Sequence, residues 1–93
     1  MNWNNEDNRR LIGVILALET ADEAERFLRD LMTEGEIEEF AKRLQAATLL
    51  TQKVPYTTIK GKTGLSSRTI ARVSSWLNGK GGGYRLMLKR MKK

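Results

Sequence analysis

Apolar residues recur at helical spacing along almost the whole 93-residue chain, and this periodicity limits the fold more than any other feature. In the first such segment the positions i, i+3, i+4 and i+7 are filled by Leu11, Val14, Ile15 and Leu18. No segment shows the strict alternation of apolar and polar residues that marks a half-buried strand. The sequence therefore predicts an all-α protein with about six helices.

Caps, glycines and one proline predict where these helices begin and end. Thr20 or Asp22 caps the second helix, because its side-chain oxygen can accept a hydrogen bond from a free N–H group of the first turn. Pro55 ends the third helix and suits the first turn of the fourth, since proline lacks the N–H that a helix interior needs. The other expected helices cover about residues 6–18, 34–52, 55–62, 67–77 and 84–92.

The first helix is apolar on most of its faces, so we expect it to be buried in a core or in a dimer interface. Two arginines precede its run "LIGVILAL", as in a secretory signal, but Glu6 and Asp7 stand before them and the acidic "ETADEAE" follows. The run is also much shorter than the 20 or so residues that span a membrane. We therefore expect no signal peptide and no membrane partner, and the absence of cysteine fits a cytoplasmic protein.

The charges of the chain are divided sharply between its two halves. All eleven acidic residues lie between Glu6 and Glu39, where there are only four arginines. From Ala41 onward there are thirteen lysines and arginines and no acid. Such a segment repels itself unless it meets a polyanion, and its regular apolar spacing indicates that it is folded. This asymmetry favours a nucleic-acid partner over a merely solvated face.

Two other functional classes fit the sequence poorly. "GKT" at residues 61–63 ends like a phosphate-binding loop, but that loop needs a glycine five residues before Gly61, where Tyr56 stands instead. The absence of histidine and cysteine removes imidazole bases, thiolate nucleophiles and nearly every zinc or iron site. We therefore expect no enzyme, no catalytic residue and no metal site.

Residues 56–77 follow the plan of a helix-turn-helix, with a short helix, a glycine turn and a second helix capped by serine. Gly64 supplies the positive φ that the turn requires, and Ser66 is the cap. The apolar residues expected to hold the two helices together are Ile59, Leu65, Ile70, Val73, Trp76 and Leu77. An ordinary pair of helices joined by a glycine turn is the alternative, and the basic charge favours DNA binding.

The opposite face of the second helix is expected to contact duplex DNA. Its N-terminal residues would lie nearest the base edges of the major groove, so Arg68 is the first candidate for a bidentate contact with guanine. Ser67 and Ala71 are candidates for a hydrogen bond and a thymine-methyl contact, whereas Ser66 and Thr69 suit phosphate. The full set of candidate DNA-binding residues is Lys60, Lys62, Ser66, Ser67, Arg68, Thr69, Ala71, Arg72 and Ser75.

An alternative is a basic adaptor that binds RNA or protein through the same surface, without reading a DNA sequence. Proteins that read RNA commonly stack bases on aromatic side chains. Four of the six aromatic residues here are expected on buried faces, namely Phe27, Phe40, Trp76 and Tyr84. That expectation leaves Trp3 and Tyr56, which are too few for a stacking platform.

The stretches "TEGEIEEFAKRLQAATLL" and "YTTIKGKTGLSSRTIARVSSWLNGKGGGYRLMLKRM" resemble the Trp-repressor-like YerC/YecD family of bacterial regulators. The resemblance covers about residues 8–91 and is most specific in "TGLSSRTIARV" and "GGGY". It implies a six-helix, intertwined cytoplasmic homodimer that presents one helix-turn-helix to each half of a palindromic operator. The length of 93 residues predicts a single domain over residues 1–93, and the resemblance implies that about 6–52 and 84–92 serve dimerisation.

The resemblance also bears on a tryptophan corepressor. In the Trp repressor pattern, an arginine of the second helix binds the tryptophan carboxylate, and the following glycine leaves room for the indole. Arg72 matches that arginine, but Val73 stands where the glycine would be, and Arg43 lies near the place of a second ligand arginine. Added methyl groups in a tight pocket clash with a ring, so we expect no cofactor and a phosphate contact for Arg72.

Overall fold

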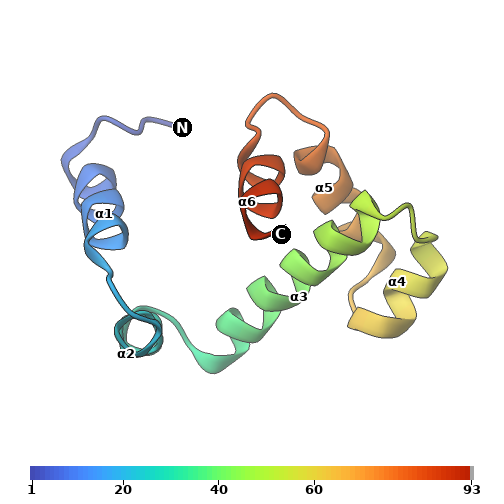
Figure 1. Cartoon of the computed structure of the whole chain (residues 1–93), viewed down its shortest axis with the longest axis horizontal. Helices are drawn as coiled ribbons and strands as arrows, with labels where there is room; N and C mark the ends of the chain where they lie inside the picture. Colours follow the sequence, from blue (N-terminus) through green and yellow to red (C-terminus); the bar gives the residue numbers. More distant parts are fainter. Residues whose placement is uncertain (93) are drawn as a thin grey trace. The chain divides into compact units, whose positions relative to one another are not determined.

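The computed structural model describes residues 1–92 and confirms the all-α prediction, with six helices and no strand in that range (Figure 1). The helices are α1 (Glu6–Ala17), α2 (Ala21–Leu31), α3 (Glu34–Thr51), α4 (Tyr56–Thr63), α5 (Ser67–Leu77) and α6 (Gly83–Met91). None of the helices in these residues is both long and apolar enough to cross a membrane.

Six predicted boundaries shift by one residue, and in three of these cases the flanking residue is a cap. Leu18 lies outside α1 in an extended conformation, and its N–H bonds the carbonyl of Ile15 at 3.3 Å. Pro55 is the N-cap of α4 and not part of its first turn, since its ψ of 148° is extended. The last helix begins at Gly83, after Gly82 in the left-handed region, and not at Tyr84. Of the two candidate caps of α2, the structure selects Thr20, whose Oγ1 accepts the N–H of Glu23 at 3.1 Å.

The chain divides into two compact units, Met1–Glu34 and Gly35–Lys93. In the first unit no residue of α1 or α2 is buried, although α1 is rich in apolar side chains. The expected burial of α1, in a core or in a dimer interface, therefore stays a prediction. Its exposed large apolar side chains are Leu11, Val14, Ile15 and Leu16.

The second unit contains the hydrophobic core. Helices α4, α5 and α6 gather around the C-terminal half of α3 (Figure 1). The buried cluster consists of Ala46, Ala47, Ile59, Leu65, Ile70 and Val73, with Leu49, Leu50, Val54, Tyr84 and Leu88 packed against it. Two alanines of α3 contribute to this cluster, and their small side chains let other helices approach α3 closely. The core therefore lies directly beneath the predicted helix-turn-helix.

Two aromatic residues are not buried as predicted. Trp76 is 49% exposed and Phe40 is 42% exposed, although both were expected on buried faces. Trp76 departs because Val73 and Leu77 already fill the side of α5 that meets the core. Phe40 lies in the N-terminal half of α3, whereas the buried residues of that helix, Ala46 and Ala47, lie farther along. Phe27 and Tyr84 are partly buried.

The end of α3 contains one strained residue, Lys53, whose φ of 61° lies in the left-handed region. The N–H of Val54 bonds the carbonyl of Leu49, and the N–H of Lys53 bonds that of Leu50, so Lys53 occupies the position where helix ends favour glycine. Lys53→Gly should therefore raise the free energy of unfolding by about 0.5–1 kcal/mol, the relief of strain exceeding the added freedom of the unfolded chain.

Urea denaturation followed by circular dichroism would measure this gain. Lys53→Ala is the matched control, because alanine loses the same side chain but keeps the strain at positive φ. An equal gain in the alanine variant would contradict the explanation from backbone strain.

Candidate nucleic-acid interface

The turn between α4 and α5 is built on Gly64, as the sequence predicted. Its φ of 74° and ψ of 1° are left-handed, and its N–H closes α4 on the carbonyl of Lys60 at 2.9 Å. A side chain there would meet no atom within 4 Å, so conformation and not space demands glycine. The next residue, Leu65, is only 5% exposed, and its side chain packs in the core between the two helices.

Thr63 also shapes this turn, and the sequence reading missed it. Thr63 is buried, and its hydroxyl donates to the carbonyl of Ile59 at 2.8 Å while accepting the N–H of Leu65 at 3.2 Å. The side chain therefore joins the last turn of α4 to the first residue beyond Gly64. The signal for this role is a small hydroxyl residue directly before the glycine of the turn.

Ser66 fixes the start of α5. Its Oγ accepts the N–H of Thr69 at 3.1 Å, which confirms the predicted cap, and it also lies 3.1 Å from the Thr69 hydroxyl. These two residues, predicted to bind phosphate, are thus held together at the N-terminal end of α5. The partial positive charge of that helix end is suited to an anion.

Helix α5 has one buried face and one exposed face, and the predicted candidates lie on the exposed face. Ile70 and Val73 are fully buried and Leu77 is nearly so, which places these residues as predicted. The exposed candidates on α5 are Ser67, Arg68, Ala71, Arg72 and Ser75, and Thr69 is partly buried at the edge. Lys60 and Lys62 are exposed on α4. Every candidate within the two helices is therefore exposed except Thr69, and Ser66 lies just before α5 as its cap.

The exposed face is basic and has no acid to neutralise it. No acidic residue follows Glu39 in the sequence, so none lies on α4, α5 or α6. Among residues 1–92, the last residue along the chain with an ion pair is Arg43, which bonds Glu39 at 3.2 Å. Lys60, Lys62, Arg68 and Arg72 therefore keep their charges free for an external anion.

The C-terminal end of α5 is held by a side chain of α6. Arg85 donates from Nη1 to the carbonyl of Leu77 at 2.6 Å, and Asn78 donates from Nδ2 to that of Ser74 at 2.9 Å. A cation is favourable there because the last carbonyls of a helix carry partial negative charge. This contact could not be predicted from the sequence, because the glycine-rich segment between α5 and α6 leaves the distance between the two helix ends undetermined.

Val73 and Arg43, which the resemblance connects with a tryptophan site, have other contacts in the structure. Val73 is 0% exposed and is part of the core cluster, so its methyl groups occupy the packed interior. Arg43 bonds Glu39 and lies over the rings of Phe40 and Trp76. Within residues 1–92, no three His, Cys, Asp or Glu side chains gather as a metal site requires.

A helix, a left-handed glycine turn and a second helix capped by serine define this protein as a helix-turn-helix protein by its structure. The chain belongs to the Trp repressor protein family, whose pattern it matches over residues 6–92. That match includes all six helices of residues 1–92.

The relatives support the same assignment. The chain is 39% identical over 83 residues to the uncharacterized protein YerC of Bacillus subtilis (strain 168), a match that covers 89% of this chain and 80% of that protein. It superposes with a TM-score of 0.91 on a TrpR-like protein from Eubacterium eligens ATCC 27750, at 34% identity, covering 96% of this chain and 92% of the other. A candidate Trp repressor from Staphylococcus aureus gives 0.90 at 34% identity, with 98% and 94% covered. The resemblance to the YerC and Trp repressor families is thereby confirmed.

Proposed function

We propose that this protein is a DNA-binding transcriptional regulator, acting as a repressor, and that it reads the major groove of duplex DNA through α5. One observation carries the proposal: α5 exposes a basic face without acids, while Ile70 and Val73 anchor its other face in the core. Membership of the Trp repressor protein family supports a regulator and not an enzyme.

Each exposed residue takes a role set by its chemistry. Arg68, in the first turn of α5, donates two hydrogen bonds to a guanine, and Ser67 and Ala71 contact neighbouring base edges. Lys60, Lys62 and Arg72 bind phosphates, which fix the register of the protein on the duplex. Ser66, Thr69 and Ser75 complete the surface with hydroxyl groups.

We further propose that the protein acts in the cytoplasm as a homodimer on a palindromic operator. The exposed apolar side chains of α1 support this, because a second copy would cover them and bury apolar surface. A dimer also presents two copies of α5, as two half-sites of an operator require.

We propose that DNA binding needs no tryptophan corepressor. The burial of Val73 supports this, since a side chain in the core leaves no slot beside Arg72 for an indole ring. The contacts of Arg43 with Glu39, Phe40 and Trp76 support it as well, because they occupy the second candidate for binding a carboxylate.

Affinity for duplex DNA should fall steeply with salt, because each bound phosphate releases counterions. If Lys60, Lys62 and Arg72 each bind one phosphate in both copies, the logarithm of affinity should fall with the logarithm of salt with a slope of about −5. Fluorescence anisotropy on random and selected duplexes, from about 50 to 200 mM salt, would measure that slope.

The same titration tests the adaptor alternative. Single-stranded RNA and duplex DNA of equal length serve as matched probes, and tighter binding to RNA would favour the adaptor. The contacts of Phe40 and Trp76 with Arg43 argue against it, because the guanidinium of Arg43 already lies over both exposed rings at cation–π distance. Binding that is independent of salt, or no duplex binding at about 50 mM salt, would contradict the regulator proposal.

A further inference from the structure

Arg43 on α3 lies over two aromatic rings, of which one belongs to its own helix and the other to α5. Its guanidinium carbon lies 5.4 Å from the centroid of the Phe40 ring and 5.8 Å from that of the Trp76 ring. Its Nε lies 3.2 Å from a carboxylate oxygen of Glu39, one helical turn earlier on α3. Glu39, Phe40 and Arg43 lie on α3, and only Trp76 lies on α5.

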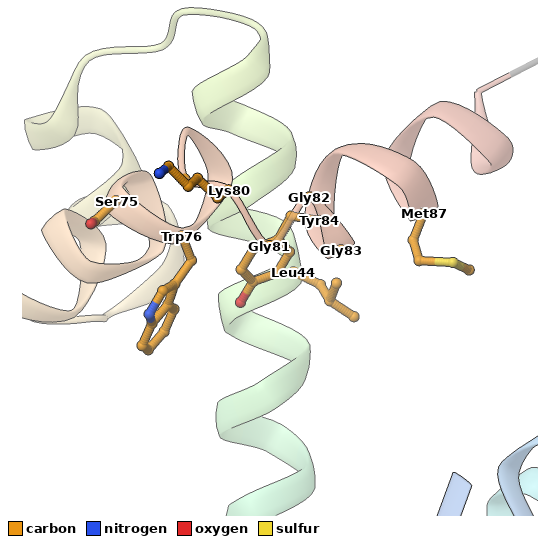
Figure 2. A pocket seen from close by; sticks show the side chains of 10 residues that line it. Leu44, Ser75, Trp76, Lys80, Gly81, Gly82, Gly83, Tyr84 and Met87 are labelled. Atoms are coloured by element: carbon orange, nitrogen blue, oxygen red, sulfur yellow. The ribbon is translucent and has the colours of Figure 1, made fainter. Parts of the chain in front are cut away.

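The support of the Trp76 ring is one-sided. Trp76 borders a hollow of about 650 Å³, which Leu44, Tyr84, Met87 and the glycine segment 79–83 also line (Figure 2). Because the side chain is 49% exposed, packing in the core does not fix its orientation. A planar guanidinium can stack on a ring in a defined geometry, whereas apolar contacts have no preferred direction.

The place of Trp76 on α5 connects it to the DNA-facing residues. Trp76 lies one turn after Arg72. It lies eight residues after Arg68, and this separation is about 12 Å along the helix axis. Because the Ser66 cap and the Gly64 turn fix the start of α5, a contact at Trp76 adds a restraint at its C-terminal half, and a shift there would move Arg72 and, to a smaller extent, Arg68. The core residues Ile70 and Val73 pack α5 against the rest of the unit, but they lie on the face opposite the exposed arginines.

We propose that Arg43 is a positioning residue for α5, which it orients through Trp76, so that it sets the affinity and base preference of α5 without contacting DNA. This inference rests on the proposed function in DNA binding. The competing role is a direct phosphate contact by the Arg43 guanidinium. The two roles differ in what lysine can replace, since lysine keeps the charge but not the planar stacking surface.

A double-mutant cycle on a selected duplex tests the proposal, using Arg43→Lys, Trp76→Leu and the double variant. Each single change should weaken binding to the selected duplex about three- to tenfold and binding to random duplexes less than about twofold, with the salt slope unchanged. The double variant should lose no more affinity than the single variant with the larger loss. Additive losses in the double variant would overturn the proposal. Full affinity in Arg43→Lys, together with a loss on all duplexes in Arg43→Ala, would also overturn it, because it would indicate a direct phosphate contact.

Tryptophan fluorescence gives a readout that needs no DNA. In a Trp3→Phe background only Trp76 emits, and Arg43→Lys should change the wavelength or intensity of its emission, whereas Lys42→Ala, an exposed change next to Arg43 on α3, should not. Unchanged emission in folded Arg43→Lys would overturn the proposal, even if DNA binding by the native protein holds. A changed emission in a protein that binds no duplex would instead contradict the proposed function.

Discussion

Replacing Arg68 with alanine is expected to lower affinity for a selected duplex by about 1–3 kcal/mol, a loss of roughly 5- to 150-fold. The reason is geometric as well as electrostatic. Arg68 is exposed in the first turn of α5, the part of such a helix that lies deepest in the major groove. Because the Ser66 cap and the Gly64 turn fix the start of α5, the guanidinium can approach a base edge from a rigid support.

The base preference should relax at the position that Arg68 reads, so the loss should be smaller on duplexes with that base pair changed. Anisotropy titrations against a set of single-base variants of the selected duplex would measure it. Lys62→Ala is the matched control, since Lys62 is an exposed cation on α4 assigned to phosphate. It should weaken all duplexes alike and reduce the salt slope by about 1 per copy. An equal loss on every duplex for Arg68→Ala would show that Arg68 binds only phosphate.

The helix-turn-helix could be predicted from sequence because its determinants are local. Ile59, Leu65 and Ile70 lie within a dozen residues of one another around Gly64, and the spacing alone sets which side each faces. The burial of these side chains and the left-handed glycine were confirmed. Caps such as Thr20 and Ser66 were predictable for the same reason, since a cap and its N–H partner are three residues apart.

The exposed rings and the contacts at the ends of α5 could not be predicted in this way. Helical spacing says that Trp76 and Phe40 lie near an apolar face, but not what stands opposite that face. Arg43 is three residues from Phe40, yet thirty-three residues separate it from Trp76, and only the fold brings them together. The bond from Arg85 to Leu77 likewise crosses the glycine segment.

The exposed state of α1 has a related cause. Its apolar run predicted burial, and the spacing of residues does not distinguish burial within one chain from burial between two copies. In the structure Leu11, Val14 and Ile15 are exposed, and a second copy that covers them is part of the proposed function.

Replacing Ile70 with alanine is expected to have the largest effect on stability, lowering the free energy of unfolding by about 2–5 kcal/mol. Ile70 is 0% exposed and lies in the core cluster beneath α5, so the change removes buried surface and leaves a cavity among Ile59, Leu65 and Val73. For a domain of this size each kcal/mol lowers the melting temperature by about 4–8 °C. Urea and thermal denaturation, followed by circular dichroism at a fixed protein concentration, would measure both quantities.

Two variants on the same helix control this result. Ile70→Val removes one methylene and should cost about 0.5–1.5 kcal/mol, whereas Ser75→Ala, on the exposed face of α5, should change stability by less than about 0.5 kcal/mol. A cost for Ile70→Ala no greater than that for Ser75→Ala would show that the buried face of α5 is not the one assigned here. Ile70 and Arg68 lie on opposite faces, so Ile70→Val should keep the base preference that Arg68→Ala relaxes. This comparison distinguishes the contribution of Ile70 to stability from the contact of Arg68 with a base.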